Sequence, residues 1–346
     1  MRKNYSRLEF ASSVIMAISL VSMSASSTTC AAPKKALARS LSVNSKLGDS
    51  GALIEPSRRM RFRDSPWDYE IRIALPPSYN QTKNSYPVLW VIDGSYNFEA
   101  AVDQVTTSAK DHVPDMIVVS VGTPPEARNE FMRRRAYDFS STRNNDICSY
   151  QEPGGHLYEK QCKLVLDWSK AAGEPSVDLL GGAPKFLNFI IDDVRKQLAS
   201  DYRMENDNTL FGFSAGGYFC TYALLTRPDG FDRYICGSPN LNIDAGIAFQ
   251  LEEAYAKSHT DMKAKVFFSA GEDEITQGGV VSAAGLVSWM ARMAEILKVR
   301  NYPSLELHAR VFPGEIHDGS GARISLYWGL RTLWSNQYPS ETARQR

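Results

Sequence analysis

The chain has 346 residues, of which 43% are hydrophobic and 23% are charged, an ordinary globular composition with enough apolar material for a large core. Lys+Arg and Asp+Glu number 39 each, so the formal net charge is zero. This balance lacks the basic surplus typical of nucleic-acid-binding proteins, and we expect no nucleic-acid partner.

The first 32 residues have the pattern of a secretory signal peptide. Arg2, Lys3 and Arg7 form a positive head, a serine-diluted apolar stretch follows, and small residues end the segment. The apolar run is shorter than the roughly 20 residues that a membrane span needs, and a buried N-terminal helix is the alternative. We predict cleavage after Ala31 or Ala32, a periplasmic or secreted location, and no stable membrane insertion of the mature chain.

Five cysteines are present: Cys30, Cys148, Cys162, Cys220 and Cys236. If Cys30 leaves with the signal peptide, the other four enter an oxidising compartment, where disulfides form. Cys148 and Cys162 share one irregular segment and are the first candidates for a pair. Cys220 and Cys236 could also pair, with buried free thiols as the alternative. No cysteine spacing fits a zinc site, and we expect neither a metal nor another cofactor.

Along the chain, residues 33–60 are polar with weak periodicity, which is typical of a flexible lead-in. The segment 67–79 alternates apolar and polar side chains, which predicts a half-buried strand at an antiparallel edge. Short apolar runs then alternate with stretches of helical periodicity. We expect strands over 88–92, 115–122, 208–213, 232–240, 264–273 and 305–314, and helices over 181–202, 215–227, 280–299 and 320–334.

This alternation predicts an α/β protein with a mainly parallel central sheet flanked by helices, in one domain over residues 61–338. Residues 141–182 lack a clear period and contain two cysteines, so we expect an insertion between sheet elements there. In such folds, the loops at the carboxyl ends of the strands carry function.

The stretch Thr209–Phe219, "TLFGFSAGGYF", places Ser214 between Gly212 and Gly216 where a strand turns into a helix. A strand that ends in Gly-x-Ser-x-Gly and continues directly into a helix is the nucleophile elbow of the α/β-hydrolase fold. The glycines leave room for a sharp turn, and the hydroxyl projects beside helix amides that favour negative charge. We predict Ser214 as a nucleophile, with a structural serine in a glycine-rich turn as the alternative.

A serine hydroxyl needs a base, and in this fold the order along the chain is Ser, acid, His. Among the histidines after Ser214, His259 lies in a polar helix-like stretch, His308 inside a strand, and His317 in a loop before the last helix. Only that loop should hang over the carboxyl end of the sheet. We predict His317 as the base, with a structural loop histidine as the alternative.

The orienting acid is expected after the strand that precedes this histidine loop. That strand ends in Glu272, Asp273 and Glu274, and Asp244, after the preceding strand, is an outside candidate. Consecutive residues at a strand end point in different directions, so normally only one of the three can face the histidine. The others are expected to be solvated loop charges, and the pattern alone leaves the choice open.

The oxyanion of an acyl-transfer reaction needs two backbone amides aimed at the developing charge. One should come from Ala215, directly after the nucleophile. The other is expected after an early strand, where "WVIDGSYNF" places Ser95 behind a tight turn at Gly94. A plain β-turn at Gly94 is the alternative.

The order "LPPSYN…YPVLWVIDG…RRRAYDFS…GGAPKFLNFI…LFGFSAGGYF…LLTRPDGFDRYICGSPNL…SAGEDE…FPGEIHDG" resembles the "Putative esterase" family of α/β-hydrolases over roughly residues 65–335. That family includes siderophore esterases, S-formylglutathione hydrolases, feruloyl esterase domains and the antigen 85 mycolyltransferases. The periplasmic siderophore-esterase type is the most similar.

The resemblance implies the α/β-hydrolase fold with Ser214 as nucleophile, His317 as base, and the amides of Ser95 and Ala215 as oxyanion donors. The family's acid is the third residue after a glycine at a strand end, which here is Glu274. Arg135 and Asp138 fall on an Arg/Asp-Tyr pair common near the family's site, in a structural or substrate-flanking role.

These residues together predict a serine esterase that acts on a small-molecule carboxylic ester through an acyl-enzyme intermediate, without metal or cofactor. An acyltransferase that uses the same acyl-enzyme is one alternative. A non-catalytic binding protein on the same fold is the other.

Overall fold

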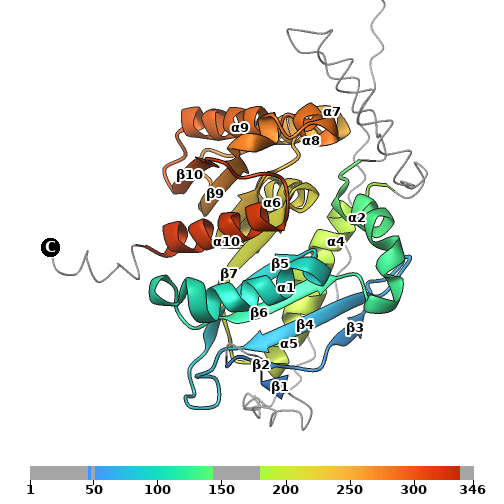
Figure 1. Ribbon diagram of the computed structural model, residues 1–346, viewed down its shortest axis with the longest axis vertical. Helices are drawn as coiled ribbons and strands as arrows, with labels where there is room; N and C mark the ends of the chain where they lie inside the picture. The colour runs from blue at the N-terminus through green and yellow to red at the C-terminus, as the bar shows by residue number, and fades with distance from the viewer. Residues whose placement is uncertain (1–45, 48–50, 143–179, 336–346) are drawn as a thin grey trace, which may run out of the picture. The chain divides into compact units, whose positions relative to one another are not determined.

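The computed structural model describes residues 46–47, 51–142 and 180–335, coloured from blue to red in Figure 1. The predicted signal peptide, most of the lead-in over 33–60 and nearly all of the predicted insertion over 141–182 lie outside these residues. The predicted Cys148–Cys162 pair also lies outside them. The proposed domain limits therefore stay predictions.

The core of the fold is one ten-stranded mixed sheet with the order β1-β2-β4-β6-β5-β7-β8-β9-β10, and β3 pairs with β4. Six neighbouring strands pair in parallel, in the order β6, β5, β7, β8, β9 and β10. The pairs among β1, β2, β3 and β4 are antiparallel, and so is the pair of β4 with β6. The strands are β1 Lys46–Leu47, β2 Leu53–Ile54, β3 Arg58–Met60, β4 Tyr69–Leu75, β5 Tyr86–Ile92, β6 Ile117–Gly122, β7 Met204–Phe213, β8 Arg233–Gly237, β9 Ala264–Gly271 and β10 Leu305–Phe312. The predicted mainly parallel sheet is confirmed.

Helices cover both faces of the sheet (Figure 1). They are α1 Gly94–Asp103, α2 Phe131–Phe139, α4 Ala183–Asn188, α5 Arg195–Asp201, α6 Ala215–Thr226, α7 Ile243–Ser258, α8 Gly279–Ala284, α9 Leu286–Arg300 and α10 Gly319–Trp334. One apolar cluster joins a sheet face to α1 and α10, around Phe98 and Leu326. The larger cluster joins the other face to α4, α5, α6, α7 and α9, around Phe186, Tyr218 and Met290.

Strand β5 is buried over its whole length, as its continuous apolar run predicted. Strand β4 belongs to the antiparallel edge of the sheet, as predicted, because β1 to β4 pair antiparallel at one end of the strand order. The expectation of a half-buried strand is wrong, since β4 is buried over nearly its whole length. Strands β1, β2 and β3 extend the sheet beyond β4. Glu70, on the polar side of β4, is buried beside Arg59, with Nη1 3.2 Å from its carboxylate.

Three helical features differ from the sequence prediction. The continuous helix expected over 280–299 is interrupted at Gly285, whose φ of 60° is left-handed and separates α8 from α9. Gly94, where a tight turn is expected from the sequence, is instead the first residue of helix α1. Helices α1, α2 and α7 have no counterpart among the predicted elements.

A disulfide joins Cys220 in α6 to Cys236 in β8, with 5.5 Å between their Cα atoms. Both residues are fully buried. The pairing considered from the sequence is therefore present, and the free-thiol alternative is wrong. The bond ties the helix after Ser214 to the strand beside it.

Candidate active site

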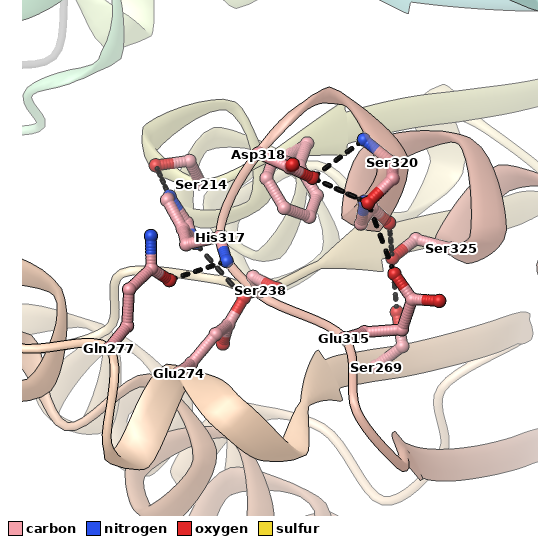
Figure 2. Close-up of polar contacts among 12 residues, drawn as sticks. Ser214, Ser238, Ser269, Glu274, Gln277, Glu315, His317, Asp318, Ser320 and Ser325 are labelled. Carbon is pink, nitrogen blue, oxygen red and sulfur yellow. Dashed lines mark hydrogen bonds and ion pairs between the residues drawn. The ribbon is translucent and has the colours of Figure 1, made fainter.

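The parallel strands end at one edge of the sheet, and the predicted site residues follow them there. Ser214 follows β7, Glu274 lies one turn after β9, and His317 lies in the loop between β10 and α10. Because carboxyl ends of parallel strands meet at the same edge, residues distant in sequence come together. Figure 2 shows the three side chains converging.

Ser214 occupies the sharp turn between β7 and α6, with φ 62° and ψ −123°, a strained conformation for a non-glycine residue. Close backbone packing explains the glycines around it. A Cβ at Gly212 would lie 2.1 Å from the Gly216 carbonyl oxygen, and one at Gly217 would lie 2.3 Å from the Gly237 carbonyl oxygen. Gly216 is less crowded, since its nearest neighbour would be Asp93 Oδ2 at 3.2 Å.

His317 lies between the serine and an acid. Its Nε2 is 2.8 Å from Ser214 Oγ, and its Nδ1 is 3.0 Å from Glu274 Oε1. The ring stacks on Phe213 with 4.9 Å between centroids, and its backbone amide donates to Gln277 Oε1 at 2.7 Å. These contacts fix both the ring plane and the loop, so a proton can pass from the Ser214 hydroxyl to Nε2 while Nδ1–H donates to the acid.

Of the three carboxylates after β9, only Glu274 faces the histidine. Glu274 is the third residue of the 3₁₀ turn Glu272–Ile275, and it is 2% exposed. Glu272 is exposed and accepts from the Gly314 amide instead, and Asp273 is half-buried, with its backbone amide donating to Glu315 O. Asp244, the outside candidate, lies in α7.

The other two histidines that follow Ser214 have different surroundings. His308 lies on β10, where its Nε2 is 3.1 Å from Glu306 Oε1 and its side chain is 43% exposed. His259 follows α7 and stacks on Tyr255 with 4.1 Å between ring centroids. Neither contacts the serine, which agrees with the sequence-based choice of His317.

The two predicted oxyanion amides belong to the first turns of helices on neighbouring parallel strands. Ala215 begins α6 after β7, and Ser95 is the second residue of α1 after β5. First-turn amides have no intrahelical acceptor, and the helix dipole favours negative charge beside them. The Ser95 hydroxyl donates to Thr123 O at 2.8 Å, and Gly122 permits the close approach, since its Cβ would lie 2.9 Å from the Ser95 amide nitrogen.

Asp93 and Arg135 link these two amide-bearing loops. Arg135 Nε donates to Asp93 Oδ2 at 2.9 Å, and Nη2 donates to Phe213 O at 3.1 Å. Burial raises the pKa of Asp93, and the adjacent Arg135 charge opposes that shift. Asp138, the other residue of the family pair, is buried away from the histidine and accepts from the Tyr69 hydroxyl at 2.6 Å.

Sequence reasoning missed the segment Gly237–Asn240. The Ser238 hydroxyl donates to Glu274 Oε1 at 2.6 Å, so it touches the oxygen that faces His317 (Figure 2). The signal that could have found it is "GSPN" at the end of a buried strand, at the same sheet edge as Ser214.

Among residues 46–47, 51–142 and 180–335, no cluster of three or more His, Cys, Asp or Glu side chains could hold a metal ion. None of the helices in this part of the chain combines the length and apolarity that crossing a membrane requires.

The chain matches the family model described as "Putative esterase" over residues 64–163 and 176–289. The ferri-bacillibactin esterase BesA of Bacillus subtilis is 29% identical over 203 residues, which is 56% of this chain and 62% of that protein. A siderophore enterobactin esterase of Emericella nidulans is 28% identical over 189 residues, or 52% of this chain and 55% of that protein. The chain thus spans only about half to three fifths of the length of these curated relatives.

Solved structures share the fold. An IroE-like serine hydrolase from Shewanella oneidensis superposes with a TM-score of 0.64 at 23% identity, covering 81% of this chain and 80% of that chain. The siderophore hydrolase EstA from Aspergillus nidulans gives a TM-score of 0.65 at 19% identity, with 82% and 94% covered. At such identities the likeness establishes the α/β-hydrolase fold alone.

Proposed function

The chain belongs to the "Putative esterase" family, and from this premise we propose that it is a periplasmic or secreted serine esterase that hydrolyses carboxylic esters. The observation that carries the proposal is the continuous contact from Ser214 through His317 to Glu274, at 2.8 and 3.0 Å. A serine, histidine and acid in this order and geometry make up the machinery of serine hydrolases.

In the proposed reaction, Ser214 Oγ attacks the ester carbonyl carbon while His317 Nε2 takes the hydroxyl proton. The amides of Ser95 and Ala215 stabilise the oxyanion, and Glu274 stabilises the imidazolium that forms. Nε2–H then protonates the leaving alcohol as the C–O bond breaks, which leaves an acyl-enzyme. A water molecule, deprotonated by the same nitrogen, releases the acid and restores the hydroxyl.

For the substrate class, we propose an ester of a siderophore, in line with the names of the curated relatives. Exposed apolar side chains next to the site residues in sequence support a substrate with apolar groups. Tyr96, Ile275 and Ile316 are 62%, 59% and 38% exposed, and each adjoins in sequence one of the proposed catalytic or oxyanion residues. Tyr96 also packs edge-to-face on Phe131, with 4.5 Å between ring centroids. Exposed apolar side chains beside candidate site residues are suited to contact with an apolar part of a ligand.

A fluorophosphonate probe followed by peptide mapping tests the nucleophile. We expect one adduct, on Ser214, and a loss of hydrolysis by several orders of magnitude in Ser214→Ala. His317→Ala should be nearly inactive, whereas His308→Ala should retain activity in its folded fraction. An adduct on another residue, or equal losses in the two histidine variants, would refute the assignment.

An activity screen tests the substrate class. Siderophore lactones, feruloyl esters and simple aryl esters are compared by kcat/KM, with products identified by mass spectrometry. We expect the siderophore esters to be preferred and the free acid to accumulate. Transfer of the acyl group to an added sugar or lipid alcohol in place of water would identify an acyltransferase.

A further inference from the structure

The segment Gly237–Asn240 contacts both the nucleophile and the acid of the proposed triad. The Ser214 amide donates to Gly237 O at 3.0 Å, and the Asn240 amide donates to Ser214 O at 3.3 Å. Between these two contacts, the Ser238 hydroxyl donates to Glu274 Oε1 at 2.6 Å. Four consecutive residues therefore hold the backbone of one catalytic residue and the side chain of another.

The backbone at Ser238 is held in an uncommon conformation. Its φ of 39° is left-handed, its amide donates to Ser269 O at 2.7 Å, and the residue is 1% exposed. A serine in this region persists only where its surroundings fix it, and such residues gather at functional sites. The conformation directs the hydroxyl at Glu274.

Glu274 depends on Ser238 for its orientation. Oε1 accepts from both His317 Nδ1 and the Ser238 hydroxyl, whereas the buried Oε2 has no hydrogen-bond partner in the described part of the chain. Because one oxygen accepts both bonds, a partial rotation of the carboxylate would weaken both of them together. A buried carboxylate also costs free energy unless hydrogen bonds offset the loss of water.

We propose that Ser238 is a positioning residue for catalysis, which acts by holding Glu274 Oε1 against His317 Nδ1 and by stabilising the ionised carboxylate. The inference rests on the proposed function, since it assigns Ser238 a role only through the triad. Ser238 makes no contact with the reacting atoms; its effect passes through Glu274 to the histidine.

Ser238→Ala removes the donor and keeps the side-chain volume nearly constant. A hydrogen bond to a charged group is a strong one, so we expect kcat to fall roughly 10- to 100-fold. KM should stay within about twofold, because substrate contacts are unchanged. Ser269→Ala is the matched control: it also deletes a buried hydroxyl, one that donates to Ser325 Oγ at 2.9 Å, and should keep the wild-type kcat.

Ser238→Gly is a second variant that relieves the left-handed backbone while also lacking the hydroxyl. If Ser238→Ala folds poorly, the glycine variant still reports the loss of the hydroxyl. Both variants should show the same kcat per folded molecule, with folding measured by circular dichroism. A purely structural serine would instead lower stability and leave the kcat of folded enzyme unchanged.

A double-mutant cycle separates action through Glu274 from any other effect. In a Glu274→Gln background, Ser238→Ala should cause less than about a twofold further loss of kcat, because the group it positions is gone. The inference is overturned if Ser238→Ala matches Ser269→Ala, or if its loss is the same in both backgrounds.

Failure of the proposed function has a different signature. In that case the wild-type protein itself would hydrolyse no ester and form no fluorophosphonate adduct on Ser214, and the inference would fall with it. A labelled, active wild type with an unaffected Ser238→Ala would overturn the inference alone.

Discussion

Arg135 and Asp93 form an ion pair at the carboxyl edge of the sheet, with Nε 2.9 Å from Oδ2, although their side chains are only 16% and 8% exposed. Asp93 directly precedes Gly94 and Ser95, the first two residues of α1, and the second contact of Arg135 is the carbonyl of Phe213, directly before Ser214. One guanidinium therefore ties together the two loops that carry the proposed oxyanion amides. Arginine suits this position because its planar fork donates in two directions at once.

The first prediction concerns the two contacts of Arg135, with Asp93 and with the Phe213 carbonyl. Arg135→Lys keeps the charge but cannot hold both acceptors in the same geometry, so the Ser95 and Ala215 amides should lose their alignment. Deleting a single oxyanion donor costs on the order of 10²- to 10³-fold in kcat, and we expect a loss near the lower figure. Steady-state kinetics on an aryl ester measure it.

The control is Arg133→Lys, which changes an exposed arginine on the same helix. This variant should keep the wild-type kcat. Equal kinetics for Arg135→Lys and wild type would show that the ion pair serves stability alone. Arg135→Met should also destabilise the fold, because it leaves the buried Asp93 charge without its partner.

The second prediction separates the acids. Glu274→Gln leaves the serine and the amides in place but allows the wrong tautomer of His317, and should lower kcat on the order of 10²- to 10⁴-fold. Glu272→Gln and Asp273→Asn alter groups that do not contact the histidine and should stay near wild type. The three isosteric variants are assayed side by side, with circular dichroism to confirm folding. If kcat falls strongly in Glu272→Gln or Asp273→Asn but not in Glu274→Gln, the residue changed in that variant is the acid. If kcat falls in none of the three variants, the enzyme works with a Ser–His dyad.

Much of the fold and the sharp turn that carries the proposed nucleophile could be predicted because the deciding signals are local. The apolar run of β5 and the turn at Ser214 depend on residues adjacent in sequence, and both appear as expected. His317 and Glu274 required fold-level order or family spacing, since several residues of the same type follow Ser214. Periodicity alone could not have chosen Glu274 over Asp273.

The remaining features depend on tertiary contacts that leave little trace in the sequence. Ser238 and Glu274 are 36 residues apart, and their contact depends on β8 and β9 pairing in parallel register. Arg135 comes from a helix whose run of three arginines resembles a solvated surface, and only the family resemblance points to it as a residue near the site. The burial of β4 depends on the short strands β1 to β3, which are too brief to give a periodic signal.

The third prediction concerns the disulfide. Cys220 and Cys236 are 16 residues apart and fully buried, and a cross-link closing a loop of that size contributes about 3 kcal/mol to the free energy of unfolding. The double variant Cys220→Ala/Cys236→Ala should lose about that much, read from urea unfolding under oxidising conditions. An unchanged unfolding midpoint would show that the bond does not form in the purified protein. Any dependence on reductant that remains in the double variant would report the predicted Cys148–Cys162 pair.

The last prediction concerns Asp138, a buried carboxyl that accepts from the Tyr69 hydroxyl at 2.6 Å. Burial raises the pKa of Asp138 well above its usual value of 3.8, against the opposing effects of the Tyr69 hydrogen bond and the Arg134 charge. Above pH 3.8 the unfolded chain releases this proton, whereas the folded protein retains it until the raised pKa is reached. The folded state therefore binds more protons in that window.

Linkage then requires that this group's contribution to the free energy of unfolding fall as pH rises through the window, by at most about 1.4 kcal/mol per pH unit. Asp138→Asn keeps an acceptor for Tyr69 but cannot titrate, so the stability of the variant relative to wild type should increase with pH. Urea unfolding of both proteins from about pH 4.5 to about pH 8 measures the difference, with the exposed Asp193→Asn as the matched control. The expectation is contradicted if the difference in unfolding free energy stays flat, or if the stability of wild type relative to the variant rises with pH. Asp138 would then be ionised in the folded protein, with the Tyr69 hydrogen bond and the Arg134 charge outweighing burial.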